Sequence, residues 1–195
     1  REFYEILPTI SKAAAIKLST KKKGIKPITL KTLGVKSVGD TFFIPVLNHA
    51  GALVSLHKFE LSSPSVIQSP KPLSLSILGL HTLSDDHSTV MICEGHWDYL
   101  VMSQEKLDSH ICLLGVSGSF FPQSYLHYLA NKHIILLFDN DEAGREGINH
   151  IARNLKANNI SVTSISYLDW LKIHLKEYKS IPDKFDIRDL YNTLQ

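Results

Sequence analysis

Acidic side chains follow two apolar runs that have the composition of buried strands. Glu94 ends the run in "TVMICEG", and Asp139 and Asp141 end the run in "IILLFDNDEAG", 45 positions further along the chain. Carboxylates at such close spacing repel each other and raise each other's pKa unless a cation or a proton compensates their charge. Hard oxygen ligands that leave room for water and phosphate suit Mg²⁺ or Mn²⁺. The spacing therefore indicates a divalent-cation site.

The elements that would position these acids follow from the rhythm of the chain after Ser88. Strand-like apolar runs alternate with helical stretches, which is typical of a parallel sheet. We predict strands at 89–93, 111–116, 133–138 and 160–168, and helices at 97–107, 122–130 and 141–159. Ligands bind outside the carboxyl ends of the strands in such sheets. Glu94, Asp139 and Asp141 would therefore converge if the first and third strands are neighbours.

The part of the chain before Ser88 predicts a smaller α+β unit. Its predicted elements are a helix over 3–18, a short helix opening near Pro27 or Thr29, a strand hairpin over 41–61 with "NHAG" at its turn, and a Ser- and Pro-rich loop over 62–72. The tail predicts a loop followed by a short helix over 183–194. We accordingly divide the chain into an N-terminal subdomain, residues 1–87, and a second domain, residues 88–195.

Composition bounds the class of protein. The 195 residues are 44% hydrophobic with a mean hydropathy of −0.01, which suits a soluble globular protein. No apolar run approaches the roughly 18 residues of a membrane span. The chain begins at Arg1 without a leader, so we expect a fragment of a longer, cytoplasmic protein. Cys93 and Cys112 lie in apolar runs, which favours a reducing compartment, and the ten histidines form no zinc-binding pattern.

Charge is distributed unevenly along the chain. Residues 1–36 contain nine Lys or Arg and two acids, whereas the rest of the chain contains twelve and seventeen. A basic arm beside an acidic body fits a polyanionic ligand together with a cation site. Lys21, Lys22 and Lys23 in "KKKG" are candidates for phosphate contacts, and the alternative is that they form a solvated turn.

The acidic residues admit other interpretations. A calcium loop of the EF-hand type would need an acid or amide where Ala143 stands, a glutamate where His150 stands, and a helix before it. A response-regulator phosphoacceptor site would need a pair of acids after the first strand, where Glu94 is followed by glycine. Asp139 or Asp141 could cap the following helix, but capping alone requires only one of them.

Two motifs taken together resemble a known family. "MICEGHWDYL" followed by "IILLFDNDEAGREG" resembles the TOPRIM domain shared by DnaG-type primases, topoisomerases and certain nucleases, and the primase branch fits best. Further segments are similar to parts of the same family: "GVSG", "FDIRDLY" and "KKKGIKPITLKTLGV". "FFIPVLNHAGALVSLHKFE" resembles the strand pair typical of phage and plasmid primases. The resemblance implies an α/β fold with a Rossmann-like parallel sheet flanked by helices, preceded by a smaller α+β subdomain.

The resemblance also implies roles for individual residues. Glu94, Asp139 and Asp141 would be catalytic and would hold Mg²⁺ or Mn²⁺ as a pair of ions. Glu94 would act either as a third ligand or as the group that handles the proton of the attacking hydroxyl. Asp186 in "FDIRDLY" would be a further metal ligand, or it could cap a short helix. Lys71 would contact nucleic acid or nucleotide.

Four further residues would support this site. Asp98 lies one helical turn beyond Glu94 and could brace it, or it could be an exposed helix acid. Gly95 and Gly144 would let the backbone pass close to a phosphate or metal, and Gly144 could instead serve helix–sheet packing. Arg145 could clamp a phosphate or lie on a solvated helix face.

The function that the resemblance implies is synthesis of RNA primers on single-stranded DNA from nucleoside triphosphates. A replicative helicase or an adjoining helicase domain would be a further partner. The alternatives are a TOPRIM nuclease, a topoisomerase-related enzyme, whose tyrosine we do not identify, and a non-catalytic DNA-binding module. An intact acidic set argues against a pure binding module, which has no need of it. No GxxxxGK[ST] loop occurs, so we expect no P-loop ATPase in this fragment.

Overall fold

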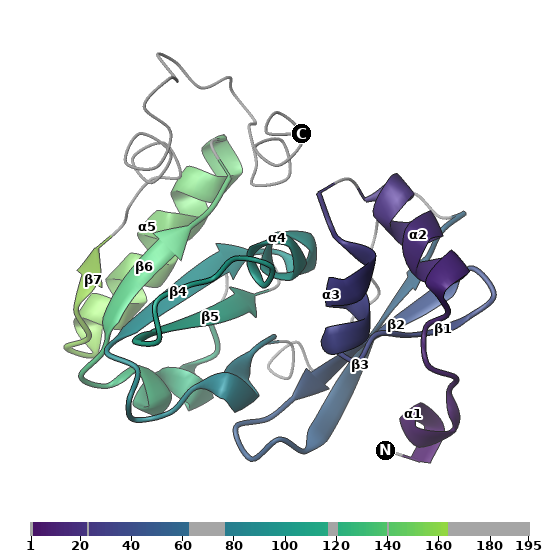
Figure 1. The fold of residues 1–195 in the computed structure, drawn as a ribbon. Helices are drawn as coiled ribbons and strands as arrows, with labels where there is room; N and C mark the ends of the chain where they lie inside the picture. Colours follow the sequence, from purple (N-terminus) through teal and green to yellow (C-terminus); the bar gives the residue numbers. More distant parts are fainter. Residues whose placement is uncertain (1, 23, 63–76, 117–120, 140, 164–195) are drawn as a thin grey trace.

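The computed structural model describes residues 2–22, 24–62, 77–116, 121–139 and 141–163. They form two lobes that lie side by side (Figure 1), one built on an antiparallel sheet and one built on a parallel sheet. The predicted α/β class is confirmed. Within these residues, no helix has the length and apolar character of a membrane span.

The N-terminal lobe is a three-stranded antiparallel sheet covered by helices. Its elements are α1 Glu2–Ile6, α2 Lys12–Lys21, α3 Pro27–Thr32, β1 Lys36–Val38, β2 Thr41–Leu47 and β3 Leu53–Glu60, with strand order β1-β2-β3. Side chains along β2 alternate, so that Phe42, Ile44 and Val46 are buried while their neighbours are partly exposed. They share one core cluster with Leu18 of α2 and Leu30 of α3. This alternation is the expected pattern of a strand with one buried face.

The start of this lobe differs from the prediction. A single helix over 3–18 is wrong, because the chain is extended between α1 and α2. Pro8 lies in the break, where its missing N–H and fixed φ disfavour a continuous helix. Thr9 pairs with Lys36 in an isolated antiparallel bridge, and Ser11 then caps α2 through its Oγ, which accepts from Ala14 N at 3.1 Å. The short strand β1 was also not predicted, whereas α3 and the β2–β3 hairpin are confirmed.

The second lobe is a four-stranded parallel sheet with helical connections. Its elements are η2 Leu80–Thr82, β4 Thr89–Glu94, α4 His96–Met102, β5 Ile111–Val116, η3 Gln123–Leu129, β6 His133–Leu137, α5 Glu142–Ala157 and β7 Val162–Thr163. The strand order is β5-β4-β6-β7, and all pairs are parallel. Both the parallel sheet and the adjacency of the strands that precede the acids are therefore confirmed.

The central strand β4 is buried on both faces, which explains its unbroken apolar sequence. Val90 and Ile92 share a core cluster with α5 and η3 on one side of the sheet. Met91 and Cys93 face the other side, where α4 and the N-terminal lobe complete a second cluster. The parallel sheet is thus a layer between α5 and the N-terminal lobe.

Several element boundaries differ from those predicted. Helix α4 ends at Met102 rather than at 107, and the segment predicted as a helix at 122–130 is the 3₁₀ helix η3. The structure describes the predicted strand at 160–168 only as β7, and the predicted tail helix lies outside the described residues.

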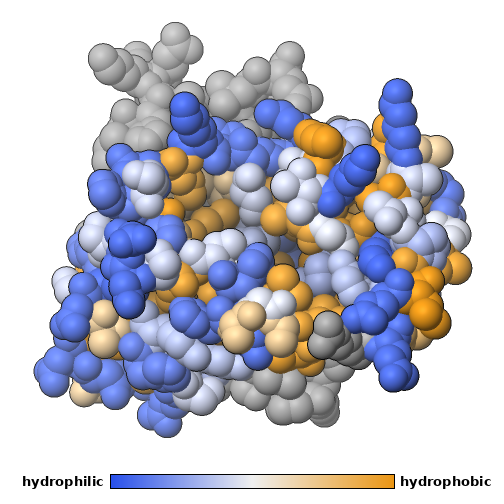
Figure 2. All heavy atoms as spheres, turned by 60° about the horizontal axis from the view of Figure 1, so that its bottom comes forward, coloured by the Kyte–Doolittle hydropathy of each residue, from blue (hydrophilic) through white to orange (hydrophobic). Residues whose placement is uncertain are grey.

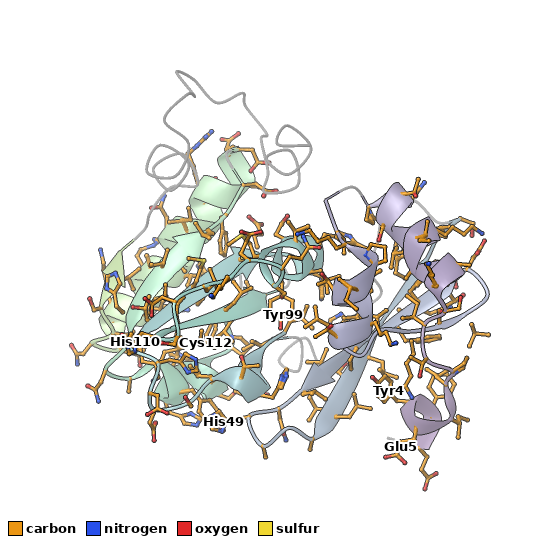
Figure 3. All side chains as sticks on the ribbon, in the orientation of Figure 1. Tyr4, Glu5, His49, Tyr99, His110 and Cys112 are labelled. Carbon is orange, nitrogen blue, oxygen red and sulfur yellow. The ribbon has the colours of Figure 1, made fainter. Side chains whose placement is uncertain are left out.

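Close packing fixes α4 against the sheet. Tyr99 points to the side of the sheet that also carries the N-terminal lobe (Figure 3). A Cβ atom on Gly115 of β5 would lie 2.6 Å from Tyr99 Cβ, and one on Gly79 would lie 2.4 Å from the Leu113 carbonyl oxygen. The two glycines therefore allow α4 to sit directly on the strands, and α4 begins just after Glu94.

Contacts between the lobes occur at both ends of the molecule. Near α4, Gln104 Nε2 donates to the carbonyl of Gly24 at 2.8 Å, and its Oε1 accepts from Thr29 Oγ1 at 3.1 Å. At the far end, His49 at the tip of the β2–β3 hairpin (Figure 3) stacks on Tyr128 of η3, with ring centroids 4.5 Å apart. The lobes are therefore held together along their whole length.

A buried histidine pair lies between these contacts. His57 of β3 is fully buried, and its ring centroid is 4.1 Å from that of His96, the first residue of α4. Burial lowers the pKa of His57 from 6.5 to about 4. Burial, with a smaller contribution from the charge of His57, lowers the pKa of His96 to about 3. Both rings are therefore neutral in the folded protein at physiological pH.

We predict that acid destabilises the fold through this pair. The folded state favours neutral His57, whereas the unfolded chain takes up the proton near pH 6.5. The contribution of His57 to stability is complete above that pH and is lost as the pH falls toward 4. At about 1.4 kcal/mol per pKa unit, the loss is on the order of 3 kcal/mol. Urea unfolding of His57→Gln should show a flatter dependence on pH across this window.

The matched control is His110→Gln, since His110 is an exposed histidine of the same lobe as His96. This variant should follow the wild-type dependence on pH. An equally steep dependence on pH in wild type and His57→Gln between pH 6.5 and 4 would contradict the prediction.

Candidate metal-binding site

The candidate site lies where β4 and β6 end. The two strands pair in parallel with Cys93 opposite Leu137, so the chain leaves both strands at the same edge of the sheet. Glu94 is the last residue of β4, and Asp139 comes two positions after the end of β6. The connection from β4 runs toward β5 on one side, while β6 lies on the other side. Such a switch in strand order is the usual ligand site of an open parallel sheet.

Glu94 is partly buried at this edge. Its Oε2 is buried and has no hydrogen-bond partner among the described residues. Burial raises the pKa of Glu94, a backbone hydrogen bond from Asp139 lowers it, and the nearby charge of Asp141 raises it further. The net pKa is above the ordinary value of 4.5. No described residue therefore supplies a positive charge that compensates the ionised side chain.

Asp141 is the N-cap of α5. One of its oxygens, Oδ1, accepts from Gly144 N at 2.8 Å, and its extended backbone ends the loop before the helix. Capping was the alternative interpretation of one acid in this pair, and it applies to Asp141. A carboxylate has several lone pairs, so the cap leaves Oδ2 available for a cation. Asp139 is partly exposed in the loop and does not serve as the cap.

Two glycines shape the turns around these acids. Gly95 has φ +87°, a conformation that favours glycine, and its N–H donates to the Val116 carbonyl at 2.7 Å. A Cβ on Gly144 would lie 2.2 Å from the carbonyl oxygen of Asp139. The first turn of α5 can therefore press against the backbone of the acidic loop only because position 144 has no side chain.

The two other predicted supporting residues behave differently. Asp98 is 7% exposed, so it is not the exposed helix acid of the alternative interpretation. The pKa of Cys93 is raised by burial and then by the charges of Asp98 and Asp139, which places both carboxylates near the end of β4. Arg145 is exposed on α5, and its backbone N–H donates to the carbonyl of Asp141 at 3.1 Å.

The donor set at this edge fits a hard divalent cation. Carboxylate oxygens are the ligands that such ions prefer, and the buried Oε2 of Glu94 has a need for positive charge that no described residue meets. The described residues do not, however, bring three His, Cys, Asp or Glu side chains into a finished ligand cluster. Asn140 and Asp186 lie outside the described residues, so the predicted role of Asp186 stays a prediction.

The predicted basic cluster is only partly a surface feature. Lys22 is 7% exposed, and its Nζ lies 4.7 Å from the ring centroid of Trp97 and 5.2 Å from that of Phe59. This cation–π arrangement links the N-terminal lobe to α4, so Lys22 does not point toward solvent as the phosphate-contact prediction requires. Lys21 is exposed, whereas Lys23 and Lys71 lie outside the described residues.

Sequence reasoning missed the histidine next to the acid. His96 follows the Glu94–Gly95 turn, and its Nε2 is buried without a hydrogen-bond partner among the described residues. A single histidine in an apolar helix carries no spacing signal, so only the packing against His57 of the other lobe identifies it.

A family model for Toprim-like domains matches residues 91–173, which begin in β4 and include α5. The match contains Glu94, Asp139 and Asp141. No curated protein sequence matches the chain. The predicted TOPRIM domain is thereby confirmed for this segment.

The solved structures that are similar to this chain include several primase structures. The primase of Aquifex aeolicus, with its zinc-binding and RNA polymerase domains, has a TM-score of 0.64 and 15% identity, covering 95% of this chain and 59% of that one. The RNA polymerase domain of Mycobacterium tuberculosis primase DnaG has a TM-score of 0.67 and 14% identity, covering 97% of this chain and 75% of that one. The primase fragment of the bacteriophage T7 primase-helicase protein has a TM-score of 0.57 and 22% identity, covering 73% of this chain and 62% of that one.

These similarities concern the fold, because the identities are low. They extend over both lobes, and the predicted fold of DnaG-type primase cores is confirmed. The chain spans less than two thirds of the Aquifex and T7 chains.

We predict that Asp141 contributes to stability through its cap. Asp141→Ala should lower the free energy of unfolding by about 1 kcal/mol, whereas Asp141→Asn should retain it, since both Asp and Asn are good N-caps. Urea unfolding with EDTA present measures this contribution without a bound cation. Asp86→Ala, at an exposed acid outside the site, is the control. An equal loss in the Asn and Ala variants would contradict the capping role.

We also predict that Glu94 costs stability when no cation is bound. Because its folded pKa is raised, the ionised form is disfavoured by folding at neutral and alkaline pH. This cost fades as the pH falls through the folded pKa and is gone below the unfolded value of 4.5. Glu94→Gln should therefore melt higher than wild type at pH 8 in EDTA, and the difference should vanish near pH 4.5.

Glu105→Gln, at an exposed glutamate just after α4, should not raise the melting temperature at pH 8. If Glu94→Gln melts at or below the wild-type temperature at pH 8 in EDTA, Glu94 is not an uncompensated charge.

Proposed function

We propose that this chain, which has a Toprim-like domain at residues 91–173 within the fold of primase catalytic cores, is the nucleotidyl-transferring part of a DNA primase. It would join nucleoside triphosphates into an RNA primer on single-stranded DNA, using Mg²⁺ or Mn²⁺. The observation that carries the proposal is the set of Glu94, Asp139 and Asp141 at one switch point, with a buried Glu94 oxygen that lacks a partner among the described residues.

The acids would divide the work of the reaction. Asp139 and the Oδ2 of Asp141, which is not the capping oxygen, would hold divalent cations, which when bound neutralise phosphate charge and favour ionisation of the attacking hydroxyl. The 3′-oxygen would form a bond to the α-phosphorus while the bond to pyrophosphate breaks. Glu94 Oε2 would take the hydroxyl proton or act as a third ligand. Its raised pKa suits proton acceptance.

Positive side chains would guide the polyanionic substrates. Arg145 is exposed on α5 next to the acidic loop, where its guanidinium could hold a triphosphate oxygen. Lys21 is the exposed member of the described lysines in "KKKG" and would contact the template backbone. One similar structure is a fragment of a primase-helicase protein, which supports a helicase as partner or neighbouring domain.

Cleavage of DNA with water is the main rival, since the same acids could activate a water molecule. The similarity of both lobes, rather than of the Toprim-like segment alone, to primase cores favours primer synthesis. Ribonucleotide incorporation on single-stranded DNA, run beside nicking of supercoiled DNA with the same protein and metal, separates the two activities. Nicking without incorporation would overturn the proposal.

We predict that Asp139→Asn weakens Mn²⁺ binding in calorimetry and leaves the circular dichroism spectrum unchanged. Asp139 is partly exposed and does not cap α5, and asparagine keeps the shape of the side chain while removing its charge. Incorporation should fall on the order of a hundredfold or more, as when a positioned electrostatic group is removed.

Asp85→Asn, at an exposed acid before the start of β4 and thus at the opposite end of that strand from Glu94, is the matched control and should retain wild-type binding. Wild-type Mn²⁺ affinity in Asp139→Asn would remove Asp139 from the ligand set. Glu94→Gln then separates the two roles of Glu94, because loss of a ligand weakens Mn²⁺ binding whereas loss of a proton acceptor lowers only the rate.

A further inference from the structure

A groove of about 340 Å³ lies between α2 and α3, on the N-terminal lobe. Its lining residues are Ile10, Ser11, Lys12 and Ala15 from the start of α2, and Pro27, Ile28 and Lys31 from α3. None of these residues belongs to the acidic site, so an inference about the groove is independent of the proposed function.

The groove presents apolar side chains to solvent. Ile10 and Ala15 are buried in its floor, at 5% and 3% exposure, whereas Ile28 is 64% exposed although it is a large hydrophobic residue. Figure 2 shows apolar patches between long hydrophilic side chains over this lobe, on the right of that view. An apolar depression with polar residues around it is typical of a binding surface.

The rim of the groove is positively charged. Lys12 and Lys31 are exposed at its edge, and neither takes part in an ion pair among the described residues. No acidic residue occurs between Glu5 and Asp40, and Asp40 is bonded to Lys17 at 2.5 and 2.7 Å. The first turns of α2 and α3 contain no acid either. The groove therefore combines an apolar floor with uncompensated positive charge.

We propose that this groove binds a short acidic peptide segment of a partner protein through one apolar anchor. The anchor side chain would cover Ile28 and contact Ile10, while carboxylates on either side of it would pair with Lys12 and Lys31. The apolar component excludes a purely acidic tail as the best partner. Complementary charge sets the orientation, and burial of the anchor supplies affinity.

A nucleic-acid strand fits the groove less well. Helices α2 and α3 have the sequences "KAAAIKLSTK" and "PITLKT", which contain no aromatic side chain and no arginine on which a base could stack. Phosphates would use the lysines but would leave Ile28 exposed. Dependence on Ile28 is therefore the property that distinguishes a peptide from a nucleic acid.

The test uses the full chain and a fluorescein-labelled synthetic peptide with one central leucine flanked by glutamates. Fluorescence anisotropy should detect binding, and replacement of the leucine by serine should abolish it. Ile28→Ser should weaken binding by about tenfold, since burial of one aliphatic side chain contributes roughly that factor. The double variant Lys12→Gln/Lys31→Gln should weaken binding by about tenfold as well, because it removes both positive charges from the rim. Ile16→Ser and Lys106→Gln, at an exposed isoleucine of α2 and an exposed lysine of the other lobe, should bind as wild type does.

Three results would overturn the proposal. The first is affinity for the peptide that does not change in Ile28→Ser. The second is displacement of the peptide by an oligo-dT strand whose affinity falls in the lysine variant but not in Ile28→Ser. That result would assign the groove to nucleic acid. The third is self-association that depends on Ile28 in sedimentation, which would assign the groove to a second copy of this chain.

Discussion

Parallel pairing of β4 with β6 is the constraint on which the site depends. The pairing sets Glu94 and Asp139 at one edge of the sheet, although 45 positions separate them in the chain. Burial of β4 on both faces stabilises this arrangement against the repulsion between the acids. Burial raises the pKa of Glu94 and of the Cys93 thiol, and the charges of nearby aspartates raise both further. This edge therefore concentrates negative charge, as the proposed cation site requires.

Both helices that begin at this edge are adapted to it. Helix α5 is capped by Asp141, and Gly144 in its first turn leaves room for the backbone of the acidic loop. Helix α4 starts after Gly95 and is covered by the N-terminal lobe through His57 and Lys22. The N-terminal lobe therefore packs against the helix that begins just after Glu94. His57 of β3 packs on His96, which follows the Glu94–Gly95 turn. A substitution on β3 can therefore affect the acidic edge through this one side-chain contact.

The sequence predicted those features that local patterns determine. Alternating apolar runs predicted the parallel sheet, and acids after two such runs predicted that these acids lie at one edge of it. The break at Pro8 could have been predicted from the missing N–H of proline, but the run of alanines in α2 dominated the helical pattern. The burial of Lys22 could not be predicted, because three adjacent lysines have the same local sequence character, and only the positions of Phe59 and Trp97 distinguish one of them. The pairing of His57 with His96 likewise depends on packing between lobes.

One hydrophobic cluster contains residues of both lobes, from Leu18 and Phe42 to Tyr99 and Leu113. A gene fragment that encodes only one lobe would therefore produce a polypeptide with half of this cluster exposed to water, which favours aggregation. Recombination between related genes would meet the same difficulty at a crossover between the lobes, because side chains selected to fit one partner lobe would meet another. Because of this shared cluster, the two lobes must be expressed and inherited together, even though each is built around a sheet of its own.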